Sequence, residues 1–84
     1  MVHRMSGTVS QLYVDDGHCY ISLKGVAEPP KDGLFELRQS HPNYNALYSL
    51  ALAAAIHGYN MEIRTIGEIG AEEYPGVNYL VVKW

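Results

Sequence analysis

The stretch NYNALYSLALAAAIHGYN, residues 43–60, decides the fold of this chain. It is rich in Ala and Leu, which have high helix propensity. Gly58 stands where a left-handed residue commonly ends a helix, and Pro42 is favoured at a first helical position. The pattern therefore predicts one helix over residues 42–57.

The predicted helix is apolar around almost its whole circumference. No Asp, Glu, Lys or Arg occurs between Gln39 and Met61. At 100° per residue, one face carries Leu47, Leu50, Ala51 and Ala54, a second stripe carries Tyr44 and Tyr48, and the far side carries Leu52 and Ile56. A helix of this kind is buried on all sides, and a chain of 84 residues has little else to cover it. We therefore predict a homo-oligomer, with Tyr44, Tyr48, Leu52 and Ile56 as the candidate interface.

Strand patterns occur on both sides of the helix. They predict strands at residues 4–14, 18–24 and 34–38 before it, and at 61–66 and 77–84 after it. Asp16-Gly17 predicts a tight hairpin, and residues 25–33, with Pro29-Pro30, and 67–76 are predicted loops. In the second strand Cys19, Ile21 and Leu23 share the core face, and Tyr20 points the other way. The last strand is apolar on both faces, which is typical of an interior strand or of a strand covered on both sides.

Three strands, one helix and two strands follow one another in the OB fold. The sequence therefore predicts an α+β protein, a five-stranded OB-like antiparallel barrel with one central helix, in a single domain over residues 1–84. Gly7 favours the barrel because closure requires strong bending of the first strand. The alternative is an open antiparallel sheet with the helix on one face.

The composition bounds the partners and the location of the protein. The net charge is −3 and the six Lys and Arg residues are dispersed singly, whereas nucleic-acid binders usually carry a basic face. The longest mostly apolar run, residues 46–56, falls short of the roughly 20 residues that span a membrane. The single Cys19 and the polar N-terminal segment suit a reducing compartment. We therefore expect a cytoplasmic protein with no membrane partner and no nucleic-acid partner.

The residues that could carry chemistry form no recognisable catalytic or metal-binding pattern. The histidines His3, His18, His41 and His57 lack the spacing of a metal site, and His41 and His57 are expected at the two ends of the helix. Cys19 is predicted in the core with His18 on the opposite face, so the two do not make a catalytic pair. We expect no catalytic residue, no metal and no cofactor.

Tyr20 and Arg38 are the candidate ligand-binding residues. Tyr20 lies on the outward face of the second strand, where an aromatic side chain of an OB fold can stack on a base or a sugar. We expect a non-catalytic, homo-oligomeric binding or adaptor module whose ligand is an unidentified protein or small molecule. The alternatives are single-stranded nucleic-acid or glycan binding on the same face, and a small enzyme with a site at a subunit interface.

Two segments carry a resemblance to known proteins. Residues 41–65, HPNYNALYSLALAAAIHGYNMEIRT, and residues 77–84, VNYLVVKW, together resemble a family of small uncharacterised bacterial proteins, some of them carried on mobile gene cassettes of integrons. That resemblance implies a cytosolic accessory protein and supplies no catalytic residues. In topology alone the chain is similar to the ring-forming, glycan-binding B subunits of AB-type toxins, which are secreted and carry an internal disulfide, whereas this chain has Cys19 alone.

Overall fold

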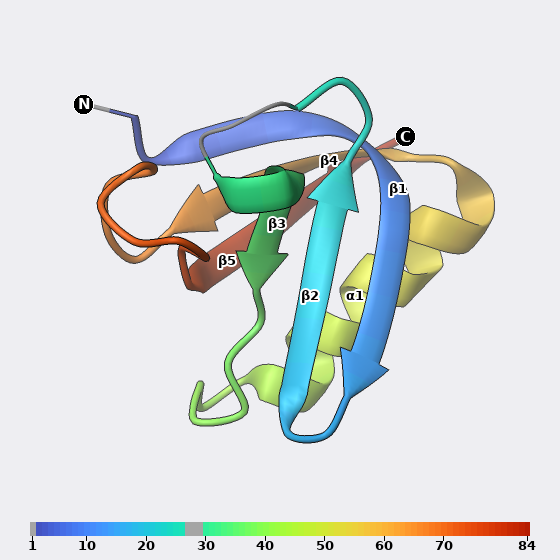
Figure 1. Cartoon of the computed structure of the whole chain (residues 1–84). Helices are drawn as coiled ribbons and strands as arrows, with labels where there is room; N and C mark the ends of the chain where they lie inside the picture. The colour runs from blue at the N-terminus through green and yellow to red at the C-terminus, as the bar shows by residue number, and fades with distance from the viewer. Residues whose placement is uncertain (1, 27–29) are drawn as a thin grey trace.

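The computed structural model describes residues 2–26 and 30–84, which form a five-stranded antiparallel sheet, one α-helix and a short 3-10 helix at Lys31–Gly33 (Figure 1). Strands β1 (Arg4–Asp15), β2 (His18–Leu23) and β3 (Leu34–Glu36) come before helix α1 (Tyr44–His57), and β4 (Asn60–Thr65) and β5 (Val77–Lys83) come after it. The α+β class and the predicted order of elements are confirmed. Residues 27–29 of the predicted loop, with Pro29, lie outside the described residues.

Strand β1 belongs to both halves of the sheet. The strands are ordered β3-β2-β1-β4-β5. Residues 4–8 of β1 pair with β4, and residues 9–15 pair with β2. The register shifts between Val9 and Gln11, just where β1 changes partner, and the strand curves strongly along its length (Figure 1). The bend expected near Gly7 is therefore present, and the irregularity in pairing comes a few residues after the glycine.

An isolated parallel bridge joins Glu36 of the edge strand β3 to Gly76, the residue before the other edge strand, β5. There the backbone N–H of Glu36 donates to the carbonyl of Pro75 at 3.0 Å. This contact does not close the sheet, so the barrel remains a prediction. The prediction that the last strand lies in the interior is wrong, because β5 is an edge strand and its Tyr79 is exposed. The apolar residues on both of its faces are instead divided between the core and the surface.

Helix α1 lies against β1, β4 and β5 (Figure 1). It buries Leu47, Ala51 and Ala54, three of the four residues predicted for its inner face. It ends at Gly58, whose φ of 68° is left-handed and whose N–H bonds to the carbonyl of Ala54. No helix in the described ranges is long and apolar enough to cross a membrane.

The start of α1 differs from the prediction by two residues. The helix begins at Tyr44 rather than at Pro42, and Asn43 is its N-cap. The preceding turn explains the shift, because the N–H of His41 bonds to the carbonyl of Arg38 at 3.0 Å and the N–H of Asn43 bonds to the ring of His41 at 3.0 Å. Pro42 therefore lies in a turn that leads into the helix.

The hydrophobic core fills the space between the sheet and α1. Its fully buried side chains include Cys19, Ile21, Phe35, Leu37, Met61, Ile63 and Val77. The predicted core faces of the second and third strands are thus confirmed. On the far side of α1, Leu52 is 39% exposed and Ile56 is 71% exposed, so the single chain leaves this side of the helix open.

Candidate functional site

The face of the sheet opposite the core carries a row of side chains centred on Tyr20. Strand pairing places Tyr13 of β1 on one side of Tyr20 and Glu36 of β3 on its other side. Directly opposed residues in antiparallel strands present their side chains on the same face. Tyr13, Tyr20 and Glu36 therefore form one row across three strands.

Three other rings surround the ring of Tyr20. Their centroids lie 5.3 Å away for Tyr13, 5.2 Å for Tyr74 and 5.8 Å for His18. The rings of Tyr13 and Tyr74 are tilted by 40° and 60° to that of Tyr20, and His18 is stacked on it. All four side chains are at least partly exposed. We name Tyr13, His18, Tyr20 and Tyr74 the tyrosine surface.

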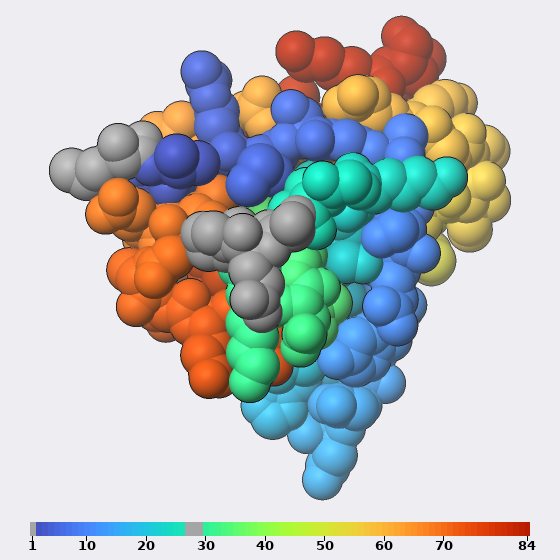
Figure 2. Space-filling model, turned by 45° about the horizontal axis from the view of Figure 1, so that its top comes forward, coloured from blue at the N-terminus to red at the C-terminus, as the bar shows by residue number. Residues whose placement is uncertain are grey.

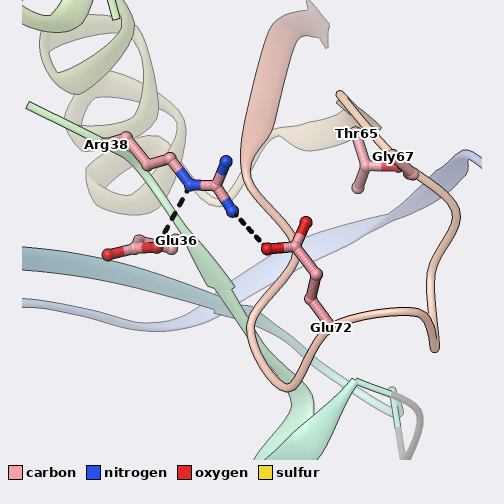
Figure 3. Close-up of polar contacts among 5 residues, drawn as sticks. All are labelled: Glu36, Arg38, Thr65, Gly67 and Glu72. Carbon is pink, nitrogen blue, oxygen red and sulfur yellow. Dashed lines mark hydrogen bonds and ion pairs between the residues drawn. The ribbon is translucent and has the colours of Figure 1, made fainter. Parts of the chain in front are cut away.

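Tyr74 belongs to the loop between β4 and β5, which Arg38 holds against the sheet. Arg38 Nη2 donates to Glu72 Oε2 at 2.8 Å, and Arg38 Nε donates to Glu36 Oε1 at 3.2 Å (Figure 3). The guanidinium lies against Gly76, where a Cβ atom would be 2.7 Å from Arg38 Cζ. A glycine at this position therefore leaves the space that the guanidinium occupies. We name Glu36, Arg38 and Glu72 the arginine clasp.

Further contacts fix the same loop. The backbone N–H of Lys31 donates to the carbonyl of Glu73 at 3.1 Å, and Lys31 Nζ is 3.6 Å from Glu73 Oε1. At the start of the loop, the hydroxyl of Thr65 lies within hydrogen-bonding distance of the carbonyls of His3 and Gly67. Figure 2 shows the loop, in orange, next to the green segment that contains Lys31. The position of Tyr74 over the sheet is thus determined by contacts on both sides of it.

The tyrosine surface lies among negative charges. Desolvation, followed by the charges of Glu36 and Asp15, raises the pKa of Tyr20. Asp15 Oδ1 is also 3.5 Å from Nδ1 of His18. Burial alone would lower the pKa of Arg38, but its bonds to Glu36 and Glu72 raise that pKa overall. The nearby guanidinium is therefore already engaged by two carboxylates.

An open groove of about 640 Å³ lies beside the arginine clasp. It is lined by Arg38, Ser40, His41, Pro42, Asn43, Ile66, Asn78 and Tyr79. Nδ1 of His41 accepts the N–H of Asn43 at 3.0 Å, so Nε2 carries the proton and donates to the carbonyl of Asn78 at 2.7 Å. Both ring nitrogens are used, and His41 serves to join the start of α1 to β5.

The cysteine and the possible metal ligands form no reactive cluster in the part of the chain that the structure describes. Cys19 is fully buried, and burial raises the pKa of its thiol, against a smaller lowering by a hydrogen bond with Tyr44. A neutral buried thiol is a poor nucleophile. Within residues 2–26 and 30–84 no group of three His, Cys, Asp or Glu side chains could hold a metal ion.

Tyr20 and Arg38 lie on the two sides of Glu36. Tyr20 pairs with Glu36 across the strands, and Arg38 bonds to its carboxylate.

The sequence interpretation missed the other rings of the tyrosine surface. The hairpin contained the signal for Tyr13, because its two-residue turn sets the register that places Tyr13 opposite Tyr20. Tyr74 comes from an irregular loop, where no periodicity indicates its position.

The four candidate interface residues lie on α1, away from the tyrosine surface. Leu52 and Ile56 are exposed, and Tyr44 and Tyr48 are partly buried against the core, with ring centroids 6.5 Å apart. No second copy is described, so their role as an interface stays a prediction.

A second group of aromatic rings lies at the end of α1. Tyr59 stacks between His57 and Trp84, with centroid distances of 5.1 Å and 5.7 Å. Trp84 is 89% exposed, and the C-terminal segment projects beside the end of the helix (Figure 2). We name His57, Tyr59 and Trp84 the C-terminal stack.

The chain was compared with protein-family models, with curated proteins and with solved structures, and none of them matched.

Proposed function

We propose that this chain is a non-catalytic, homo-oligomeric binding module that holds its ligand on the tyrosine surface. The observation that carries the proposal is the contact of Tyr20 with rings from β1, β2 and the β4–β5 loop at 5.2–5.8 Å. Tyrosine combines a large apolar area with a polar tip and is enriched in binding interfaces. A group of exposed rings that is held by a salt-bridged loop fits a recognition surface better than an incidental one.

The position of this surface fits an OB-like arrangement, which is part of the proposal. The bridge between Glu36 and Gly76 and the strong curvature of β1 both favour it. OB folds bind their ligands on the second and third strands and on the adjoining loops. The tyrosine surface shares β2 and the β4–β5 loop with that binding face but extends onto β1 rather than β3, and fold likeness by itself does not identify a ligand.

Self-association is the second part of the proposal. Leu52 and Ile56 expose apolar area on a helix without Asp, Glu, Lys or Arg. Exposed apolar patches commonly mark contact sites, and two copies can meet here without opposing like charges. The exposed side chains of Tyr79 and Trp84 add further apolar surface. The sequence resemblance to integron-cassette proteins and the lone buried Cys19 support a cytoplasmic accessory role.

Glycan or single-stranded nucleic-acid binding on the same rings is the second candidate function. Tyr13, Tyr20 and Tyr74 offer faces on which a sugar or a base can stack. Of the two ligands the sugar fits better, because the carboxylates of Asp15 and Glu36 repel phosphate groups, from which nucleic-acid binders derive most of their affinity.

NMR titration of the protein with a panel of ligands tests the binding function. The panel contains short basic and acidic peptides, a neutral oligosaccharide and a single-stranded oligonucleotide. We expect one of them to shift the tyrosine ring signals of Tyr13, Tyr20 and Tyr74, and Tyr20→Ala to abolish the response. Trp84→Ala is the matched control, since it removes an exposed ring of the C-terminal stack. Shifts confined to Trp84, or an unchanged response in Tyr20→Ala, would refute the assignment.

A further inference from the structure

We infer that the tyrosine surface binds a basic peptide segment, whose lysine or arginine side chains lie on the ring faces between the surrounding carboxylates. This inference rests on the proposed binding function and names the chemistry of the ligand. It is carried by two independent features, the arrangement of the rings and the distribution of charge around them.

The rings present faces that suit a cation. Tyr13 and Tyr74 are tilted against Tyr20 by 40° and 60°, at centroid distances of 5.3 Å and 5.2 Å. These two rings are tilted and do not lie flat on Tyr20, and of its three neighbouring rings only His18 is nearly parallel to it. An ammonium or guanidinium group within about 6 Å of a tyrosine centroid is attracted by the negative potential of the ring face.

Carboxylates lie along the whole row of rings. Asp15 and Asp16 stand at the hairpin end, Glu36 pairs with Tyr20 in the middle, and Glu72 and Glu73 lie in the loop that carries Tyr74. The charges of Glu36 and Asp15 reach Tyr20, where they contribute to the raised pKa of its hydroxyl. A cationic ligand therefore meets both favourable ring faces and favourable charges.

The basic groups near the surface are already paired. Arg38 bonds to Glu36 and Glu72, and Lys31 bonds to Glu73. His18 faces Asp15, with Nδ1 also 3.1 Å from the carbonyl of Asp16. The same pairs also engage Glu36, Glu72 and Glu73. The cations Arg38 and Lys31 are nevertheless outnumbered by the carboxylates named above, and this acidic excess disfavours an anionic ligand.

A peptide fits the surface better than a small free cation. The rings are partly exposed, and a single cation–π contact at an exposed site is weak. The carboxylates are spread from the hairpin to the β4–β5 loop, so several cations on one chain can be bound at the same time. When several cations belong to one peptide, binding of the first raises the effective concentration of the others at the surface, so the weak contacts reinforce one another.

The test compares a short lysine–glycine peptide with a glutamate–glycine peptide, tetramethylammonium ion, a neutral oligosaccharide and an oligonucleotide. Binding is followed by tyrosine NMR signals at low and high salt. We expect the basic peptide to bind and to weaken with salt. Tyr20→Ala should weaken it about three- to tenfold, whereas Trp84→Ala, outside the tyrosine surface, should leave it almost unchanged. Ring shifts of Tyr13 and Tyr74 in the unmodified protein give the same information if Tyr20→Ala does not fold.

Several results would overturn the inference. Peptide binding that Tyr20→Ala does not weaken would mean that general acidity, and not the rings, attracts the peptide. Binding of tetramethylammonium ion as tight as that of the peptide would identify a small-cation site. Binding of the oligosaccharide or oligonucleotide in place of the peptide would refute the cationic ligand and still support the proposed function. If no member of the panel shifts these rings, both proposals fail.

Discussion

Gly76→Ala is expected to destabilise the protein through Arg38, which lies on the glycine. The added Cβ would be 2.7 Å from Cζ and 2.8 Å from Nε of Arg38. Gly76 does not have a positive φ, so alanine is compatible with the backbone and the conflict lies with the side chain alone. Arg38 can swing away, but it then loses its contacts with Glu36 and Glu72.

The cost follows from those two contacts. Their distances are 3.2 Å and 2.8 Å, and all three side chains are partly exposed. Exposed ion pairs contribute roughly 0.2–1 kcal/mol each, so the loss of both lowers the free energy of unfolding by about 0.4–2 kcal/mol. Urea unfolding followed by circular dichroism measures a change of this size.

A double-mutant cycle shows whether Arg38 is the cause. In an Arg38→Ala background the clash is absent, and Gly76→Ala should cost less than about 0.5 kcal/mol or even stabilise, because alanine restricts the unfolded chain. If Gly76→Ala costs the same in both backgrounds, the contact with the guanidinium does not explain the glycine, and the reasoning about the arginine clasp is refuted.

Three further predictions concern stability. Phe35→Ala, at a fully buried position, should lower the free energy of unfolding by about 3–5 kcal/mol in urea titrations, and a loss below about 1 kcal/mol would contradict the assigned core. Gly58→Ala should cost about 1–2 kcal/mol in the same assay, because φ is 68° there; an unchanged midpoint would argue against the left-handed cap. Burial raises the pKa of the Cys19 thiol, so the thiol of the unfolded chain ionises first. The stability that is present below the unfolded pKa of about 8.5 should therefore fall as the pH rises through the folded pKa. Unfolding midpoints between about pH 8 and pH 10 should show a smaller fall in Cys19→Ala, and equal falls would contradict this origin.

Local patterns in the sequence predicted most of the fold. Alternation in the second and third strands placed Cys19, Ile21 and Phe35 in the core, where each is fully buried. The Asp16-Gly17 turn and Gly58 marked the ends of their elements correctly. These features depend on the backbone preferences of single residues and on the alternation of buried and exposed side chains. Both can be recognised from residues that are close together in the sequence.

Long-range pairing could not be predicted in the same way. The last strand is apolar on both faces, yet it lies at an edge, because sheet order depends on which strands meet and not on their composition. The arginine clasp joins Arg38 to Glu72, two residues that no local pattern connects. The tyrosine surface likewise depends on Tyr74 from the β4–β5 loop, so the sequence could indicate Tyr20 but not the group of rings around it.

The most direct test of the central claim, that a second copy covers the uncharged helix, is the molar mass in solution by light scattering. We predict a multiple of the 9.4 kDa chain, and a shift to the mass of one chain when Ile56→Glu adds a charge to the open side of α1. Val14→Glu, at another exposed apolar position, should leave the mass unchanged. A mass of 9.4 kDa for the unmodified protein at high concentration would contradict the account.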